Sequence, residues 1–496
     1  MSRPIYLTSW KQELATRFPE LSPAVVAVLA LYSFGMILAQ VSGLTAVALF
    51  LSHHLGQPFF ALRKRLSEFY KEAAAKSGVK NGIKRQDFAV ATTFAPLLRW
   101  ILSLWSGRHL PLAIDVTNLG ERFHVLAVSV VVCGVGLPVA WKVLRGGEKE
   151  PWGPQWEQLL THLKAGVPAG WTVLVLSDRG LESPDLFRFI VELGWHPLMR
   201  VKKGGKFRPG GWGNYYPFHQ LVRQVGASYA AEGIAYTGAQ LPCTLLACWT
   251  SGHEEPWLLL TDLPPEAGNA VWYGLRTWIE QGFKIIKSGC WDWQKTRMED
   301  PDRVERLWLV LAVATLWLVA LGAADESQQR ARDEAAKLER EMTLSEQQAE
   351  ARRQRERYRL EKQQEALAAR KAREQKRQAA KEQAAVERAA AKQAKAAAKA
   401  AAKGRAGQPV ASVLSRSATA AGTPPSKPVA ACQPVKGRVS AQQRTHRVSR
   451  RGLAVLKAAW AHGENPLPQH LCPEPWPNPA HSASTLTEQE FLAQQT

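Results

Sequence analysis

The chain has 496 residues, enough to hold two or more domains, and its formal net charge is +21. The charge is uneven: residues 1–109 carry 13 Lys and Arg against 5 Asp and Glu, residues 323–496 carry 31 against 18, and residues 110–322 carry 20 of each. Basic flanks indicate a polyanionic partner, most commonly nucleic acid, although tails that only aid solubility have the same composition. The six cysteines form no Cys-x-x-Cys pair, which argues against a zinc module and a disulfide framework and suits a reducing cytosol.

The N-terminal region, residues 1–108, has the periodicity of helices. Ser22 and Pro23 predict the cap and the first residue of an apolar helix. A break at residues 56–58 then separates two helical patterns, and the second pattern carries four basic residues, Arg63, Lys64, Arg65 and Lys71. A helix-turn-helix DNA reader and an ordinary helical hairpin with a basic face both have this pattern.

Two apolar stretches, residues 24–51 and 307–322, raise the question of a membrane. The first is interrupted by polar residues and glycines, and the second is shorter than the roughly 20 residues that a bilayer needs. The N-terminal sequence "MSRPIYLTSWKQELATRF" has charges where a signal peptide has an apolar region. We therefore expect two buried helices of a large core, no signal peptide and no membrane contact. A membrane protein with a charged tail is the weakest alternative, because the middle of the chain alternates as a soluble sheet does.

From residue 110 the pattern changes to strands rich in Val, Ile and Leu. The runs "LPLAIDVTNL", "FHVLAVSVVVCG" and "LPVAWKVL" predict a three-stranded meander, and a helix around 154–165 precedes a fourth strand, "WTVLVLSDRG". Ser183 and Pro184 begin a helix that ends at Gly194, and "WHPLMRVKK" is a fifth strand. The order β-β-β-α-β-α-β predicts an α/β fold with a mixed sheet covered by helices.

The later parts of the chain depart from this order. Residues 204–262 combine Gly- and Trp-rich sequence with short strand-like runs, so we expect a β-rich insertion. Residues 323–405 predict a long charged helix without the apolar seam of a true coiled coil. We expect a disordered linker over residues 406–445, followed over residues 446–496 by a C-terminal helix and a Pro-rich tail.

The stretch "VWYGLRTWIEQGFKIIK", residues 271–287, combines helical apolar spacing with four polar residues. These are Tyr273, Arg276, Glu280 and Lys287, at offsets 0, 3, 7 and 14. At about 100° per residue the four side chains form one narrow stripe along the edge of the expected buried face. The sequence therefore predicts a helix that borders a cleft.

Two aspartates interrupt or end apolar strands: Asp115 in "LAIDVTN" and Asp178 in "LVLSDRG". Each alone is ordinarily a turn or capping residue, and Arg276 with Glu280 is ordinarily an i,i+4 surface pair. Two Asp at strand ends and a Glu on a later helix can, however, converge to hold two Mg²⁺ ions. Ions about 3.5–4 Å apart support an in-line phosphoryl displacement.

The spacing of Tyr273, Arg276, Glu280 and Lys287 fits the signature Y-(2)-R-(3)-E-(6)-K. With this spacing of the four residues, the chain resembles the DDE transposases of bacterial insertion sequences, in the insertion-sequence-four-like subgroup. "IDVTN" and "LSDRGL" are similar to the first and second Asp regions of the family, and "PWLLLTDLP" and "DPDRVERLWLVLAVATLWLVALG" to segments before and after the signature. The resemblance covers residues 110–322, with a weaker likeness in "RRGLAVLKAAW" and the Pro-rich sequence after it.

The resemblance implies a ribonuclease-H-like core, residues 109–203 and 263–322, and a helical domain, residues 1–108, that binds DNA ends. It implies cut-and-paste transposition, in which metal-assisted cleavage frees a 3′-hydroxyl for attack on target DNA. The expected partners are double-stranded DNA and a second copy of the chain in the DNA complex, and the expected location is the bacterial cytoplasm, at the nucleoid when DNA is bound. The long charged helix departs from the compact pattern of the family.

The resemblance also assigns roles to individual residues. The metal ligands, for two Mg²⁺ ions that Mn²⁺ can replace, would be Asp115, Asp178 and Glu280. The DNA-phosphate contacts would be Tyr273, Arg276 and Lys287. Candidates for stacking on a flipped base are Trp249 and Trp257, although either side chain also suits core packing. The alternatives are a nuclease that cuts without strand transfer and a DNA-binding protein with a dead core, and the intact set of carboxylates weighs against the second.

Overall fold

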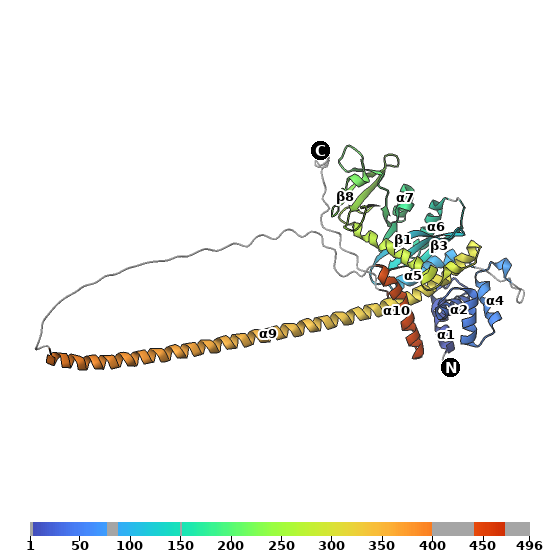
Figure 1. Cartoon of the computed structure of the whole chain (residues 1–496). Helices are drawn as coiled ribbons and strands as arrows, with labels where there is room; N and C mark the ends of the chain where they lie inside the picture. Colours follow the sequence, from blue (N-terminus) through green and yellow to red (C-terminus); the bar gives the residue numbers. More distant parts are fainter. Residues whose placement is uncertain (1–2, 77–87, 149–150, 399–440, 472–496) are drawn as a thin grey trace. The chain divides into compact units, whose positions relative to one another are not determined.

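The computed structural model describes residues 3–76, 88–148, 151–398 and 441–471. The chain divides into two compact units, of which the first comprises Met1–Gln329 with Cys432–Thr496 and the second comprises Arg330–Ala431. The first unit contains a ten-stranded sheet and the shorter helices, whereas the described part of the second is one exposed helix (Figure 1).

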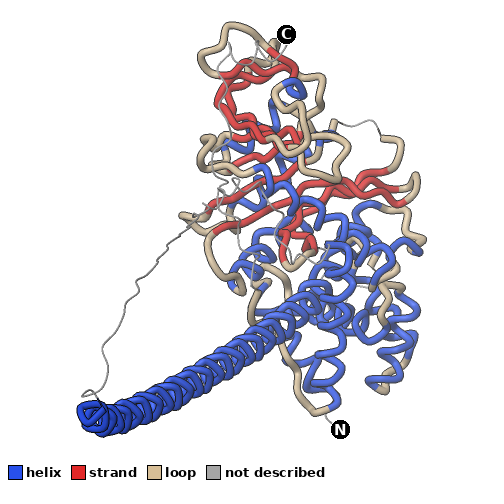
Figure 2. Tube along the Cα trace, turned by 60° about the vertical axis from the view of Figure 1, so that its left-hand side comes forward, coloured by secondary structure: helices blue, strands red, loops and turns tan. Residues whose placement is uncertain are grey.

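All strands of the sheet are red in Figure 2, and one half of the sheet has the strand order β3-β2-β1-β4-β5. Its strands are β1 (His109–Leu119), β2 (Phe123–Val132), β3 (Val135–Arg145), β4 (Thr172–Ser177) and β5 (His196–Arg200). β1 and β3 run antiparallel to β2, whereas β4 runs parallel to β1 and β5 runs parallel to β4. The helices between the later strands are α6 (Trp152–Lys164) and α7 (Pro184–Glu192). The predicted α/β fold with a mixed sheet is therefore confirmed.

The other half of the sheet comes from the region in which the sequence predicts a β-rich insertion. Its strands are β6 (Lys206–Pro209), β7 (Tyr216–Pro217), β8 (Ser228–Ala235), β9 (Leu241–Cys248) and β10 (Trp257–Thr261). β10 pairs antiparallel with β5, and the order continues as β9-β8-β6-β7. These strands therefore extend the first half into one continuous sheet instead of forming a separate one.

The N-terminal part of the first unit is helical, as the sequence predicts. Its helices are α1 (Arg3–Arg17), α2 (Pro23–Ala39), α3 (Leu44–Leu55), α4 (Phe59–Phe69), η1 (Ala73–Ala75), η2 (Val90–Thr93) and α5 (Phe94–Ser103). The Ser22 hydroxyl caps α2 by accepting a hydrogen bond from the Val25 amide at 3.4 Å. α3 ends where Gly56 adopts a φ of +65°, which glycine tolerates without strain, so the predicted break between α3 and α4 is confirmed.

The long helix α9 (Pro301–Ala398) has 98 residues and two kinds of surface. Within the first unit Trp308 and Trp317 are fully buried, and the Trp317 ring stacks on Trp10 with 3.8 Å between ring centroids. From residue 327 to residue 388 every side chain is exposed. The predicted long charged helix is thus confirmed as far as Ala398, and residues 399–405 lie outside the described part of the chain.

One described helix, Pro301–Arg388, contains a window long and apolar enough to cross a membrane. Within that window 94% of the residues are buried inside the protein, as in the core helix of a large domain. α2 and α3 reach a sufficient length only as a pair that is bent by 91°. The apolar part of α9 and most of α2 are therefore buried in the first unit, whereas α3 is only partly buried and exposes Leu49 and Phe50.

The last described helix, α10 (Ala441–Ala461), packs closely on α9. A Cβ atom on Gly322 of α9 would collide with the carbonyl of Val448, and one on Gly452 of α10 would collide with that of Leu318. The C-terminal helix is therefore confirmed. It begins at Ala441, inside the predicted linker and before the predicted start of the helix at residue 446. The remainder of the linker and the Pro-rich tail beyond residue 471 lie outside the described residues.

Candidate active site

Asp115 and Asp178 come from neighbouring parallel strands. Asp115 lies on β1, and Asp178 directly follows β4. The strand register pairs Ile114 with Ser177, so the next residue of each strand reaches the same edge of the sheet. Two carboxylates separated by more than 60 positions in the sequence thereby become neighbours.

The segment predicted as one α-helix over residues 271–287 consists of three helix types. They are the 3₁₀-helix η5 (Ala270–Thr277), the α-helix α8 (Trp278–Lys284) and the π-helix η6 (Ile285–Gly289). The prediction of a uniform 100° rotation is therefore wrong here. A 3₁₀-helix has three residues per turn, which aligns Tyr273 with Arg276, and α8 then places Glu280 one turn beyond Arg276. Arg276 and Glu280 therefore remain on one side of the segment, where they contact each other.

A pair of glycines sets the distance between α8 and the sheet. A Cβ atom on Gly282 would collide with the carbonyl of Gly136 on β3, and one on Gly136 would lie 2.8 Å from the Cα of Ile279. Because neither position has a side chain, the helix packs directly on the strand. α8 also contacts β2 and β1, so it crosses the face of the sheet and carries Glu280 toward the two aspartates.

Three carboxylates meet at the guanidinium of Arg276. Arg276 Nη2 lies 2.9 Å from Asp115 Oδ2 and 3.2 Å from Asp178 Oδ2. Arg276 Nη1 lies 2.7 Å from Glu280 Oε1. The side chains of Arg276 and Asp115 are 11% and 15% exposed, whereas Glu280 is 53% exposed. The structure thus brings together all three carboxylates that the sequence proposes as ligands, although the sequence pairs Arg276 only with Glu280.

Burial dominates the electrostatics of this cluster. It raises the pKa of Asp115 to about 6, although the charge of Arg276 and the hydrogen bond from the Val116 amide both lower it. The charges of Asp178 and Glu280 add to the rise. For Arg276, burial alone lowers the pKa, but the surrounding negative charges, that of Asp115 first, raise it overall. One positive charge among three carboxylates leaves the site with an excess of negative charge.

The cluster has the donor chemistry of a divalent-cation site. Its ligand atoms are carboxylate oxygens, which Mg²⁺ and Mn²⁺ prefer. Among the described residues no group of three His, Cys, Asp or Glu side chains is arranged to hold a metal ion, and here Arg276 lies between the carboxylates. A divalent cation fits the residues chemically. Asp115, Asp178 and Glu280 would hold it in exchange for their contacts with Arg276.

The other two signature residues differ in exposure. Tyr273 is buried, its ring packs edge-to-face on Trp257 at 5.4 Å between centroids, and the Arg200 guanidinium lies 5.9 Å from the same ring. Burial raises the pKa of the Tyr273 phenol to about 12. Lys287 is half-buried, and burial lowers its pKa while the charge of Asp115 raises it. Lys287 therefore lies within electrostatic reach of the carboxylate cluster, whereas Tyr273 supports the cluster from the core.

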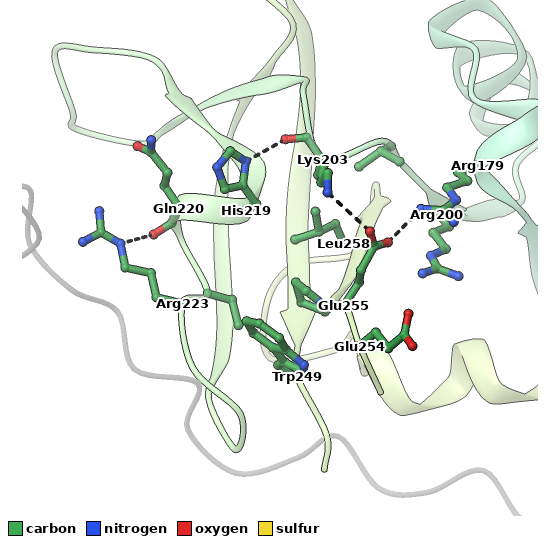
Figure 3. Close-up of a pocket in the computed structure, with 13 residues that line it drawn as sticks. Arg179, Arg200, Lys203, His219, Gln220, Arg223, Trp249, Glu254, Glu255 and Leu258 are labelled. Carbon is green, nitrogen blue, oxygen red and sulfur yellow. Dashed lines mark hydrogen bonds and ion pairs between the residues drawn. The ribbon is translucent and has the colours of Figure 1, made fainter. Parts of the chain in front are cut away.

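A cavity of about 410 Å³ begins at Arg179, the residue after Asp178, and extends into the inserted strands (Figure 3). The Glu255 carboxylate lies 2.8 Å from Arg179 Nη1 and 3.4 Å from Lys203 Nζ. Trp249 lines this cavity, whereas Trp257 does not and packs on Tyr273 instead.

The sequence pattern does not single out Arg179, Lys203 or Glu255. A signal for Arg179 exists, because it directly follows the strand-end aspartate in "SDRG". Nothing local indicates that Lys203 and Glu255, which are 52 residues apart, meet in one cavity.

Residues 112–317 match the protein family described as the transposase DDE domain. The matched region contains Asp115, Asp178 and Glu280, and it supports a DDE transposase, a class of enzyme that cleaves and transfers DNA and generally uses divalent metal ions. No curated protein matches the chain. One similar solved structure is that of the piggyBac transposase synaptic complex with hairpin DNA, which is 13% identical with a TM-score of 0.33. That similarity covers 62% of this chain and 70% of the other.

Proposed function

We propose that this protein is a transposase that cleaves and joins DNA by metal-assisted phosphoryl transfer. The observation that carries the proposal is the convergence of Asp115, Asp178 and Glu280 on one cationic position, where β4 ends beside the middle of β1. The match of residues 112–317 to the transposase DDE domain supports the same reaction class. The strand order β3-β2-β1-β4-β5 supports a ribonuclease-H-like core, and the spacing of the signature supports the insertion-sequence-four-like subgroup.

Asp115, Asp178 and Glu280 would hold two divalent ions, Mg²⁺ or Mn²⁺. When bound, the ions would activate the attacking oxygen and stabilise the leaving oxygen of the phosphodiester. Asp115 is the deepest ligand and Glu280 the most exposed, so the DNA would approach from the side of α8. Asp115 must be deprotonated to act as a ligand, and the positive charge of Arg276 favours that state.

Other residues would position the DNA. Lys287 is the signature residue that we propose as a direct phosphate contact, because Arg276 and Tyr273 are engaged inside the protein and would reach a phosphate only after releasing those contacts. Trp249 would stack on a base that enters the cavity. We further propose that the helical domain, residues 1–108, binds the element ends and that two copies of the chain assemble on them.

The decisive experiment incubates the purified protein with Mg²⁺ and DNA that carries the element's own ends. Glu280→Gln should reduce strand cleavage by about 10²-fold or more while leaving end binding intact, because it removes one charged ligand. Glu192→Gln, an exposed carboxylate on α7, is the matched control and should cleave normally. Unchanged cleavage by Glu280→Gln would remove Glu280 from the site. Nicking without joined products would indicate a nuclease, and binding without cleavage would indicate a DNA-binding protein.

Lys287→Ala tests the phosphate contact. Loss of one contact should lower the slope of log affinity against log salt by about 0.9. Lys284→Ala changes an exposed lysine three positions earlier and should leave the slope unchanged. Equal slopes for the two variants and the unmodified protein would show that Lys287 does not touch DNA phosphate.

A further inference from the structure

The exposed helix of the second unit carries basic residues along one side. Eleven positions from 352 to 388 follow one another at spacings of three or four residues and complete about ten turns of α9. Two of these positions are alanines, Ala366 and Ala384. The other nine are the basic stripe: Arg352, Arg355, Arg359, Lys362, Arg370, Arg373, Arg377, Lys381 and Arg388.

The stripe is not explained by composition alone. Residues 352–388 contain 13 Arg and Lys, and random placement would put about four of them on the eleven positions, against nine observed. The six glutamates of the segment all lie off the stripe: Glu356, Glu361, Glu365, Glu374, Glu382 and Glu387. By contrast, residues 330–350 of the same helix carry four basic and six acidic residues. The positive charge is therefore concentrated on one side of one segment.

The stripe is available to a partner in the described structure. All nine side chains are exposed. Within residues 352–388, whose side chains the structure describes, Lys362 is the stripe residue that forms an ion pair, 2.7 Å from Glu365. Such an exposed pair is weak and is screened by salt, so it does not prevent binding of another anion.

We infer that the basic stripe binds the phosphate backbone of duplex DNA. That the polyanion is DNA rests on the proposed function. At 1.5 Å per residue the stripe is about 54 Å long. Duplex DNA carries one negative charge per about 1.7 Å of its axis, so phosphates are available along the whole length of such a row. Side chains that meet phosphates give affinity without reading bases, so the stripe holds DNA of any sequence.

Pairing with a second copy through this side is disfavoured. Nine positive charges facing nine others would repel each other, because like charges along a helix interface destabilise it. The exposed Leu360 and Leu367 lie off the stripe and are seven residues apart, but the apolar spacing does not continue to position 374, which is Glu374. A polyanion is the partner that complements the charge.

The test compares two triple variants of the full chain that lose equal charge from the same helix. One replaces Arg373, Arg377 and Lys381 of the stripe with glutamine, and the other replaces the off-stripe residues Arg353, Arg357 and Lys371. Binding to a duplex of unrelated sequence is measured from 50 to 200 mM salt in EDTA, so that no cleavage occurs. Three lost phosphate contacts should lower the slope of log affinity against log salt by about 2.7 for the stripe variant and by far less for the other.

Glutamine keeps a high helix propensity, and far-ultraviolet circular dichroism checks that the helix persists. A further variant with lysine at Arg373 and Arg377 keeps the charge and should retain the slope. Equal losses in the two triple variants, or no loss in either, would overturn the inference. Tighter stripe-dependent binding of duplex RNA than of duplex DNA would also overturn it. Glu280→Gln should bind with an unchanged slope. Intact cleavage together with loss of the stripe effect would therefore overturn the stripe inference alone, and loss of cleavage with a stripe-dependent slope would overturn the catalytic proposal alone.

Discussion

Two ion clusters of opposite composition begin at consecutive residues of the chain. Asp178 belongs to a cluster in which three carboxylates share the guanidinium of Arg276. Arg179 belongs to a cluster in which two cations share the carboxylate of Glu255, on the wall of the cavity in the inserted strands. The contact distances are similar in the two clusters, but the surroundings are not.

Burial separates the consequences of the two clusters. Arg276 is 11% exposed, whereas Arg179 is 51% exposed. Desolvation therefore raises the pKa of Asp115, whereas the hydrogen bonds from Arg179 and Lys203 lower the pKa of Glu255. Solvent screens the exposed cluster, so its ion pairs contribute little to folding and its groups remain available to a ligand. The buried cluster has stronger mutual interactions, because burial reduces screening by solvent.

Removing the shared guanidinium should have the largest effect on folding. Arg276→Gln leaves Asp115 buried beside two other carboxylates without a cation, which should lower the free energy of unfolding by about 3–5 kcal/mol at pH 8. Chemical denaturation in EDTA measures this change. Arg179→Gln in the exposed cluster is the matched control and should leave the unfolding midpoint almost unchanged. Equal shifts in the two variants would show that burial does not distinguish the clusters.

The raised pKa of Asp115 predicts a pH dependence with a definite sign. The folded carboxyl has a pKa of about 6, above its ordinary value of 3.8. Between pH 3.8 and pH 6 the folded protein therefore keeps a proton on Asp115 that the unfolded chain has released. The stability that this group contributes should fall by about 2 kcal/mol as the pH rises from 4 to 6, out of about 3 kcal/mol over the whole titration.

Asp115→Asn should remove this pH-dependent contribution to stability. Measuring the free energy of unfolding of the unmodified protein and of Asp115→Asn at each pH, and taking the difference, isolates it. Glu255 has the opposite sign, because its pKa is lowered: its small, solvent-screened contribution to stability is present at neutral pH and is lost on acidification. A difference between the unmodified protein and Asp115→Asn that does not vary with pH would contradict the raised pKa.

The two tryptophans of the inserted strands should give the smallest and most selective effects. Trp249→Ala should weaken binding of DNA with an unpaired terminal base by about 1–3 kcal/mol, because it removes the stacking surface in the cavity, with little change in the unfolding midpoint. Trp257→Ala should mainly lower the unfolding midpoint, because this ring packs on Tyr273. Fluorescence anisotropy and thermal denaturation of both variants measure the two outcomes. Reversed effects would assign stacking to Trp257.

The sequence by itself determined the features that depend on local chemistry. Ser22 and Ser183 cap helices because their hydroxyls accept hydrogen bonds from amides three residues later. The alternation and length of the apolar runs predicted the five strands of the first half of the sheet and their mixed arrangement. The spacing of Arg276 and Glu280 predicted their contact, because it needs only one turn of helix.

The tertiary structure alone decided how Arg276 is shared. Its contacts with Asp115 and Asp178 depend on the register of β1 against β4 and on the glycines that let α8 approach β3. It also decided that the inserted strands continue the same sheet and that residues 270–289 change helix type twice. Periodicity in a sequence reports neighbours within one element, whereas these features arise from packing between elements that are far apart in the chain.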